Sequence, residues 1–245
     1  MTLVKAPDMT RRFFVSGYTS RYTDKNNGRG YGKRMKTRDK IVLAALELFN
    51  QYGERNITTN HIAAHIDISP GNLYYHFRNK QEIVREIFSL YSNELLERFT
   101  PVQGQQESLV LLKHYLDSIF TLMWKYRFFY ANLPEILQRD DHLHEDYIQV
   151  QEKLQANLIN IMRAFVKLEL LKVEEDEMKS LVTTLHLIAS SWLGYQAAMS
   201  QKTQVTEQII HQGMLQMIAV VKPKATEQGL EQLQLLEDGV KAIHA

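Results

Sequence analysis

The sequence predicts an all-α protein. From Thr37 onward, apolar residues recur at the spacing of amphipathic helices, and neither an alternating strand pattern nor a glycine-rich phosphate loop is found among them. The chain has 245 residues, of which 44% are hydrophobic and 23% charged, values that are ordinary for a globular protein with a buried core. This length accommodates one large domain, or a small domain fused to a larger one.

The first predicted helix covers the segment TRDKIVLAALELFNQYG, which begins at Thr37. Its apolar positions follow the i, i+3, i+4, i+7, i+8 pattern of one buried helix face. The residues on that face are Ile41, Ala44, Ala45, Leu48 and Phe49. Gly53 is expected to end the helix, because glycine is common just after a helix C-terminus.

Two short helices are predicted next, the second of them ending at about residues 76–77. Thr58 or Thr59 can cap the first by accepting hydrogen bonds from its free N–H groups. Ser69 is a suitable N-cap for the second, and Pro70 follows at the first helical position, where its missing N–H costs nothing. Such a pair is typical of a helix-turn-helix unit, whose second helix lies in the DNA major groove.

The turn between these helices has the sequence HIDIS. Asp67 falls where a positive φ is usually required, and Asp tolerates that conformation better than most residues other than glycine. In the second helix, Leu73 and Phe77 occupy the inward i, i+4 positions. The side chains left available to the outside are those of Tyr74, Tyr75, His76 and Lys80.

The N-terminal turn of the second helix is built from small residues, so its backbone can approach DNA bases closely. These residues are Ser69, Pro70, Gly71 and Asn72. The Asn72 amide can form the bidentate contact that is common with adenine. Hydroxyls and cations beside a groove are typical phosphate ligands, so the exposed side chains favour a DNA-binding surface.

The segment from Thr37 to Val84 closely resembles the N-terminal domain of the TetR/AcrR family of bacterial transcriptional regulators. The elements that carry the resemblance are AALELFNQYG, TTNHIA, IS-GNLYYHF and NK-E, which together span about 50 residues. A second stretch, NLPEILQRD at residues 132–140, is suggestive of one subgroup. The family often has AGVS in the turn, and Asp67 here adds a negative charge near DNA, which bears on affinity rather than on the fold.

The resemblance implies roles for individual residues. It implies phosphate contacts at Thr59, Tyr74, His76 and Lys80, and Thr58 and Thr59 begin the positioning helix. It implies base contacts at Asn60, Pro70, Gly71 and Asn72, with Tyr75 touching a thymine methyl group. Ser69 is the first residue of the helix surface that is expected to face DNA. The family also implies a C-terminal domain that forms the dimer and holds a ligand pocket.

A metal site is the alternative interpretation of His61 and His65, which lie four residues apart on one helical face. The glutamate of the helical zinc-protease motif is missing, because Ile62 follows His61. Exposed helix positions account better for both histidines. The chain has no cysteine, and no nucleophile–base pair or complete metal triad is visible, so the sequence predicts no cofactor, no metal and no enzyme activity.

A longer helix is predicted from about residue 79 to 99, followed by the linker TPVQGQQ. Its expected inward residues are Ile83, Ile87, Leu90, Leu95 and Phe99. Further helices are expected at about 105–126, 128–138, 142–170, 174–200 and 204–221. The expected domains are a basic disordered extension (1–35), a DNA-binding domain (36–80, with its helix-turn-helix at about 58–77), a ligand-binding and dimerisation domain (81–222) and a C-terminal tail (223–245), which can form a last short helix.

The segment LDSIFTLMWKYRFFYANL holds more aromatic mass than one helical core stripe needs. Small-molecule sites are commonly lined by aromatic side chains with a few polar groups, although a plain core around a tight turn would also explain the cluster. The ligand-binding candidates are Trp124, Tyr126, Phe128 and Tyr130, followed by His186 and Trp192.

The helices expected at 174–200 and 204–221 are candidates for a four-helix dimer interface. One stripe consists of Leu181, Leu185, Ile188, Trp192 and Tyr195, and another of Val205, Ile209, Met214, Met217 and Ile218. Either stripe can face the protein's own core instead, and we expect only one face to form the interface. Two reading helices about 34–36 Å apart would double the contacts to a palindromic operator.

Charge is distributed unevenly along the chain. Residues 1–36 hold nine Lys/Arg against two Asp, whereas residues 100–245 hold thirteen Lys/Arg against eighteen Asp/Glu. A basic arm of this kind suggests a polyanionic partner, and an alternative function is therefore nonspecific nucleic-acid binding driven by the arm. Deleting residues 1–34 distinguishes the two, because a sequence-specific reader keeps its preferred site.

Taken together, the sequence predicts a homodimeric, sequence-specific DNA-binding regulator, most often a repressor, that a small-molecule effector releases from a palindromic double-stranded operator. A cytoplasmic location without membrane contact is expected. The most apolar stretch, residues 181–199, carries threonines, serines and a histidine and is expected to be a buried helix rather than a membrane span.

Overall fold

The computed structural model describes residues 35–101, 108–199 and 205–242. They belong to two units, residues 1–40 and residues 41–245, which are treated separately. The described part of the first unit, residues 35–40, contains the start of the first helix. The predicted basic extension lies almost entirely outside the described residues.

Throughout the described ranges the regular structure is helical, as the sequence predicted, and the β-type pairing there is limited to an isolated bridge between Leu171 and Ala225. The elements are α2 (Thr37–Tyr52), η1 (Glu54–Asn56), α3 (Thr59–His65), α4 (Pro70–His76), α5 (Lys80–Arg98), α6 (Ser108–Lys125), α7 (Arg127–Gln138), α8 (Asp141–Lys167), α9 (Glu175–Met199), α10 (Glu207–Val221), η2 (Lys222–Lys224) and α11 (Glu227–Ala242). None of the helices within these ranges is long and apolar enough to span a membrane.

Helix α2 ends as predicted at Gly53, which has a φ of 82° and donates its N–H to the Phe49 carbonyl oxygen at 2.9 Å. All five residues expected on its inner face are buried. Two more, Val42 and Leu46, are also buried. The buried arc is therefore wider than one stripe.

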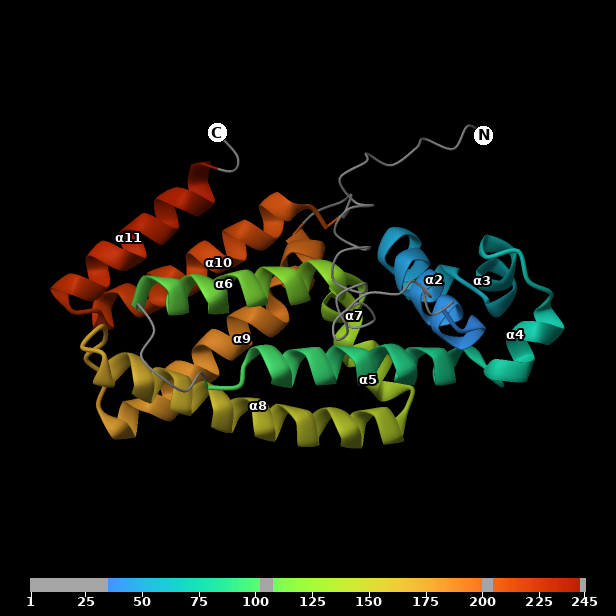
Figure 1. Cartoon of the computed structure of the whole chain (residues 1–245), viewed down its shortest axis with the longest axis horizontal. Helices are drawn as coiled ribbons and strands as arrows, with labels where there is room; N and C mark the ends of the chain where they lie inside the picture. Colours follow the sequence, from blue (N-terminus) through green and yellow to red (C-terminus); the bar gives the residue numbers. More distant parts are fainter. Residues whose placement is uncertain (1–34, 102–107, 200–204, 243–245) are drawn as a thin grey trace, which may run out of the picture. The chain divides into compact units, whose positions relative to one another are not determined.

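Helix α5 begins after Asn79, whose side chain accepts a hydrogen bond from the Glu82 N–H at 2.9 Å. Four of its five predicted inward residues are buried, but Leu90 is only half-buried. Phe88 and Tyr91 are buried in its place, because α5 packs against both α6 and α8 and so needs two inward faces (Figure 1).

Helix α7 bends in its middle. Asn132 has a non-helical φ of −130°, and its side chain donates to the Phe128 carbonyl oxygen at 3.0 Å. Pro134 follows two residues later, and a proline inside a helix cannot donate the usual backbone hydrogen bond. The bend lets the two halves of α7 contact different neighbours.

The C-terminal tail forms the last helix that the sequence suggested, and this helix is longer than expected. Helix α11 has 16 residues and buries Leu233 and Val240. Its first turn approaches the backbone before α9 so closely that a Cβ at Gly229 would lie 2.0 Å from the Leu170 carbonyl oxygen. The Thr226 N–H donates to that same carbonyl at 3.0 Å. Within the second unit, α11 lies at the opposite end from α3 and α4 (Figure 1).

Candidate functional site

The helix-turn-helix is fixed by local caps. Thr58 accepts the His61 N–H through its side chain at 3.3 Å, and the His61 ring accepts the Thr58 N–H at 3.4 Å, so the two residues form a capping box. Ser69 accepts the Asn72 N–H at 3.2 Å at the start of α4. Asp67 in the turn has a φ of 55°, which confirms the predicted left-handed position.

Helix α4 buries one side and exposes the other. Leu73 and Phe77 are fully buried, as predicted, and hold α4 against the core. Tyr74 is half-exposed, and Tyr75 is 84% exposed. The N-terminal residues proposed to meet bases are all exposed: Ser69, Pro70, Gly71 and Asn72. Asn60 on α3 is exposed as well.

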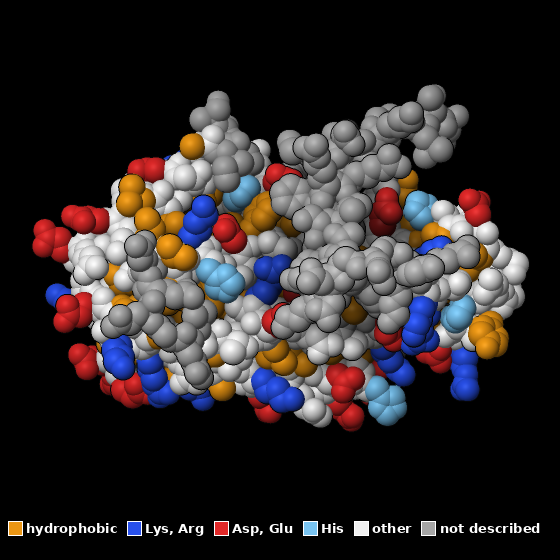
Figure 2. Space-filling model, in the orientation of Figure 1, with side chains coloured by type: hydrophobic (Ala, Val, Ile, Leu, Met, Phe, Trp, Pro, Cys, Tyr) orange, Lys and Arg blue, Asp and Glu red, His pale blue; other side chains and the backbone are white. Residues whose placement is uncertain are grey.

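Two of the implied phosphate ligands already contact each other. The Thr59 and Tyr74 hydroxyl oxygens lie 3.0 Å apart across α3 and α4. This hydrogen bond orients both hydroxyls before any partner arrives. The half-buried His76 ring packs edge-on to Tyr75, with centroids 5.1 Å apart. Figure 2 shows a hydrophobic side chain, a histidine and several Lys or Arg side chains over this end of the molecule.

Lys80 is not directed outward as expected. Its side chain is only 20% exposed, and its Nζ lies 2.8 Å from the Glu54 Oε1 atom and 2.9 Å from the Glu54 carbonyl oxygen. Glu54 is buried and also pairs with Arg139 at 2.7 Å. Burial alone would raise the pKa of Glu54, but hydrogen bonds and charge from Lys80 and Arg139 outweigh it and lower that pKa. Lys80 therefore compensates a buried carboxylate.

The histidines of α3 are exposed, in agreement with the interpretation as surface residues. His61 takes part in the capping box, and His65 lies 3.6 Å from Glu47. Among the described residues no group of three or more His, Asp or Glu side chains is arranged to hold a metal ion.

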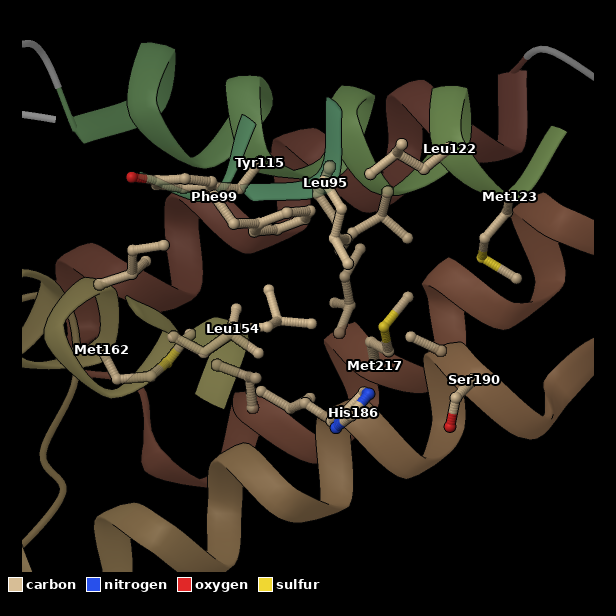
Figure 3. Close-up of a pocket in the computed structure, with 18 of the residues that line it drawn as sticks. Leu95, Phe99, Tyr115, Leu122, Met123, Leu154, Met162, His186, Ser190 and Met217 are labelled. Atoms are coloured by element: carbon tan, nitrogen blue, oxygen red, sulfur yellow. The ribbon is translucent and has the colours of Figure 1, made fainter. Parts of the chain in front are cut away.

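A cavity of about 160 Å³ lies among α5 to α11 in the second unit. Figure 3 shows side chains from several helices pointing into it, with the His186 ring directed inward from α9. Its wall is mostly aliphatic and aromatic. Residues from α5 and α6 that line it include Leu95, Phe99, Tyr115 and Leu122; residues from later helices include Leu154, Met162, His186, Ser190 and Met217.

Only two of the six predicted ligand-binding residues, Tyr130 and His186, line this cavity. The other four have different roles. Tyr126 is buried and donates its hydroxyl to Glu94 at 3.0 Å. Phe128 packs against Phe49 of α2, with centroids 5.3 Å apart.

Trp124 and Trp192 also lie outside the cavity wall. The Arg127 guanidinium sits 4.4 Å from the Trp124 ring centroid. The Trp192 Nε1 donates to the Ile209 carbonyl oxygen at 2.6 Å, which joins α9 to α10. A Cβ at Gly213 would lie 2.6 Å from the Trp192 ring, so the indole occupies the space that this glycine leaves.

The cavity residues that the sequence did not indicate come mainly from α5, α6 and α8. Phe99, Tyr115 and Leu154 look like ordinary core positions in the sequence, since helical periodicity marks a buried face but not whether the space beside it is filled. Gln151 is the exception. A polar residue on the inner side of α8 is a signal that sequence reasoning could have used.

Helix α7 connects α2 and η1, which precede the helix-turn-helix, to the cavity. Near its start, the Asn50 side chain of α2 donates to the Lys125 carbonyl oxygen at 2.8 Å and accepts the Phe128 N–H at 3.0 Å. At its end, Arg139 pairs with Glu54 of η1. The next two residues after Phe128, Phe129 and Tyr130, line the cavity. One helix thus contacts α2 and η1 and also lines the cavity.

Comparison with known families gives two matches along the chain. Residues 41–87 match the family described as bacterial regulatory proteins, tetR family, and residues 90–233 match one described as bacterial transcriptional repressor (TetR). The solved structure of a TetR-family transcriptional regulator from Marinobacter aquaeolei VT8 is 35% identical and superposes with a TM-score of 0.76. That match covers 84% of this chain and 99% of the other.

More distant relatives share less of the chain. The HTH-type transcriptional regulator UidR of Escherichia coli K12 is 34% identical over 85 residues, which cover 32% of this chain and 43% of UidR. The match thus spans less than half of that relative's length. SmeT, the repressor of a Stenotrophomonas maltophilia multidrug efflux pump, is 18% identical with a TM-score of 0.54, covers 79% of this chain and 92% of its own, and shares the fold alone.

Proposed function

The chain belongs to the TetR family of bacterial transcriptional regulators, and from that premise we propose that it is a homodimeric repressor that a small molecule releases from a palindromic operator. The observation that carries this proposal is the two-sided α4. Leu73 and Phe77 fix the helix from within, while Ser69, Gly71 and Asn72 are exposed at its N-terminal turn. A helix held rigidly with its N-terminus outward is suited to reading base edges in the major groove.

Within this surface, phosphate and base contacts fall on different residues. Thr59, Tyr74 and His76 are the proposed phosphate ligands, and the shared hydrogen bond between the first two sets their geometry. Asn60, Pro70, Gly71 and Asn72 are the proposed base contacts, with Tyr75 against a thymine methyl group. Because Lys80 neutralises Glu54, its proposed contribution to phosphate binding is reduced to a long-range one.

The proposed dimer forms through an exposed apolar face of α9. Leu187, Tyr195 and Met199 are 62%, 54% and 70% exposed. They lie along one side of the helix, and apolar side chains gathered in this way favour a protein interface. The stripe expected on α10 supports the core instead, because Met214, Met217 and Ile218 are buried within the protein.

The proposed release mechanism uses α7. A ligand in the cavity would press on Phe129 and Tyr130, and Asn50 and Glu54 would pass the displacement to α2 and η1. The two copies of α4 would then no longer match successive major grooves. The ligand acts only to the extent that it binds this second arrangement more tightly than the first.

Selection of bound sequences from random DNA tests the proposal. The wild-type dimer should select a palindrome. Asn72→Ala should relax the base preference at one position in each half-site, because its side chain is proposed to contact that base, whereas Tyr74→Ala should weaken binding to all sequences alike. A wild-type protein without sequence preference, whose binding disappears on deletion of residues 1–34, would instead support nonspecific binding by the basic arm.

The dimer is tested by light scattering of purified variants. Leu187→Glu and Tyr195→Glu should shift the protein to the monomer mass, because each introduces a charge into the proposed interface. Ile148→Glu on α8 is the matched control, since Ile148 is 49% exposed but lies on another helix. A monomeric wild type, or equal effects of all three changes, would contradict this interface.

A further inference from the structure

The cavity wall carries no formal charge. No Lys, Arg, Asp or Glu occurs among the described residues that line it. His186 is the one imidazole among them, and burial lowers its pKa, so it is neutral near pH 7.5. A carboxylate or an ammonium group entering this space would lose its hydration without gaining an opposite charge, which is strongly unfavourable.

Most polar atoms of the wall already have partners within the protein. The Tyr91 and Tyr130 hydroxyl oxygens lie 3.1 Å apart. Tyr115 donates to the Thr100 carbonyl oxygen at 3.4 Å, and Ser190 donates to the Leu187 carbonyl oxygen at 3.3 Å. Figure 3 agrees, because the Tyr115 hydroxyl points away from the centre of the cavity. These groups need nothing from a ligand.

Gln151 differs from them. Its Oε1 atom is buried and accepts no hydrogen bond from any described residue. Gln151 lies on α8 and lines the cavity together with Leu154, one turn further along. A buried acceptor without a donor costs stability, and a donor supplied by a bound molecule recovers that cost. The atom therefore marks where a polar group of the ligand belongs.

We propose that the cavity binds a small, uncharged and predominantly apolar molecule that carries a hydrogen-bond donor, and that this donor is received by the Gln151 Oε1 atom. The proposal rests on the proposed function, because it takes the cavity as the effector site. The volume agrees with a small ligand: apolar cavities of about 150 Å³ stay dry and bind molecules such as benzene.

The proposal is tested by competition in the absence of DNA. At pH 7.5 the full chain is saturated with benzene, a neutral apolar molecule that suits a cavity of this volume, and displacement calorimetry reports the binding of competitors. Four competitors, each with eight carbon atoms, are then tested for displacement. They are 1-octanol, its isomer heptyl methyl ether, octanoate and octylammonium. The alcohol donates a hydrogen bond, the ether does not, and the last two are charged.

We expect 1-octanol to compete about tenfold better than the ether, since one hydrogen bond to an otherwise unsatisfied acceptor is worth about that ratio. Octanoate and octylammonium should compete at least about 100-fold more weakly than the alcohol. In Gln151→Leu, the alcohol should lose its advantage over the ether while ether binding stays within about twofold.

Gln155→Leu is the matched control, because Gln155 lies one turn further along α8, does not line the cavity and donates to Thr183 at 3.4 Å. It should keep the tenfold ratio. Circular dichroism checks that each variant is folded, and Gln151→Met replaces Gln151→Leu if the latter is not. Charged competitors as effective as octanol, an unchanged ratio in the Gln151 variant, or no displacement by any neutral competitor would each overturn the proposal.

Because the assay contains no DNA, its outcome is separate from that of operator selection. A cavity that binds the alcohol in a protein without sequence-specific DNA binding would refute the proposed function and leave the ligand class intact. A protein that selects a palindrome but binds octanoate more tightly than 1-octanol would refute the ligand class and leave the proposed function intact.

Discussion

The Asn50 side chain accepts the Phe128 N–H at 3.0 Å, and the same carboxamide donates to the Lys125 carbonyl oxygen at 2.8 Å. Asn50 lies on α2, whereas the other two residues lie at the junction of α6 and α7. The Phe49 and Phe128 rings pack beside this pair of hydrogen bonds. The junction between α6 and α7 is therefore attached to α2 by one polar side chain and one aromatic contact.

Asn50→Asp should weaken this attachment. The variant keeps the acceptor for the Phe128 N–H but points a carboxylate oxygen at the Lys125 carbonyl, so we expect a loss of about 1–3 kcal/mol in the free energy of unfolding. Urea denaturation measures the loss, and hydrogen exchange of the Phe128 amide should become faster. Asn56→Asp is the control, because Asn56 donates to the Tyr52 carbonyl at 2.7 Å on an exposed surface. Equal losses in both would argue against a special role for Asn50.

Glu54→Gln should destabilise the protein by about 2 kcal/mol at pH 7, because it leaves Lys80 and Arg139 without their common carboxylate. The folded-state pKa of Glu54 is lowered, so its stabilising effect is complete above the unfolded value near 4.5 and is lost as pH falls through the folded value. The difference between wild type and variant should therefore shrink toward acid pH.

Denaturation curves from pH 7 to pH 3 measure this difference. Glu135→Gln is the control, since Glu135 is more exposed and lies 3.2 Å from Arg139. It should cost less than about 1 kcal/mol. A Glu54→Gln penalty that stays constant across the range would show that the carboxylate charge is not what stabilises the fold.

His186 should make the stability depend on pH in a higher range. Burial lowers its folded-state pKa, so the unfolded chain binds the proton more readily and stability decreases as pH falls below about 6.5. His186→Gln should remove this part of the decrease between pH 7.5 and pH 5. Thermal unfolding at matched pH values tests the prediction, with the exposed His142→Gln as control. Parallel curves for wild type and His186→Gln would refute it.

Gly229→Ala and Gly239→Ala should have opposite effects although both lie in α11. The new Cβ at position 229 would lie 2.0 Å from the Leu170 carbonyl oxygen, so the helix must move and about 2–3 kcal/mol of stability should be lost. Nothing lies within 4 Å of a Cβ at position 239, where alanine should stabilise the helix by about 0.5–1 kcal/mol. Calorimetry of the two variants compares their stabilities directly. Destabilisation by both substitutions would contradict the prediction for Gly239→Ala.

The helix-turn-helix could be predicted because its determinants are local. Ser69 and Thr58 cap helices within three residues of themselves, and Asp67 needs only its own backbone conformation to be recognised. Lys80 was placed wrongly for the opposite reason. Its partner Glu54 is 26 residues away, and periodicity cannot indicate a buried carboxylate that binds it.

The aromatic cluster after Leu122 shows a second limit. Tyr126, Phe128 and Tyr130 alternate between three neighbours, namely Glu94, Phe49 and the cavity. The helices packed around α7 decide which ring faces which neighbour. Composition could reveal the amount of aromatic surface but not its direction.

The Trp192 indole, seated over Gly213 and bonded to the Ile209 carbonyl, fixes the register of α9 against α10. These two helices therefore behave as one rigid unit. A second copy that docked on α9 would meet a surface that does not change shape. In the proposed release mechanism, a displacement must therefore pass through other helices, so substitutions that alter release should cluster around the bent α7 rather than on α9 and α10.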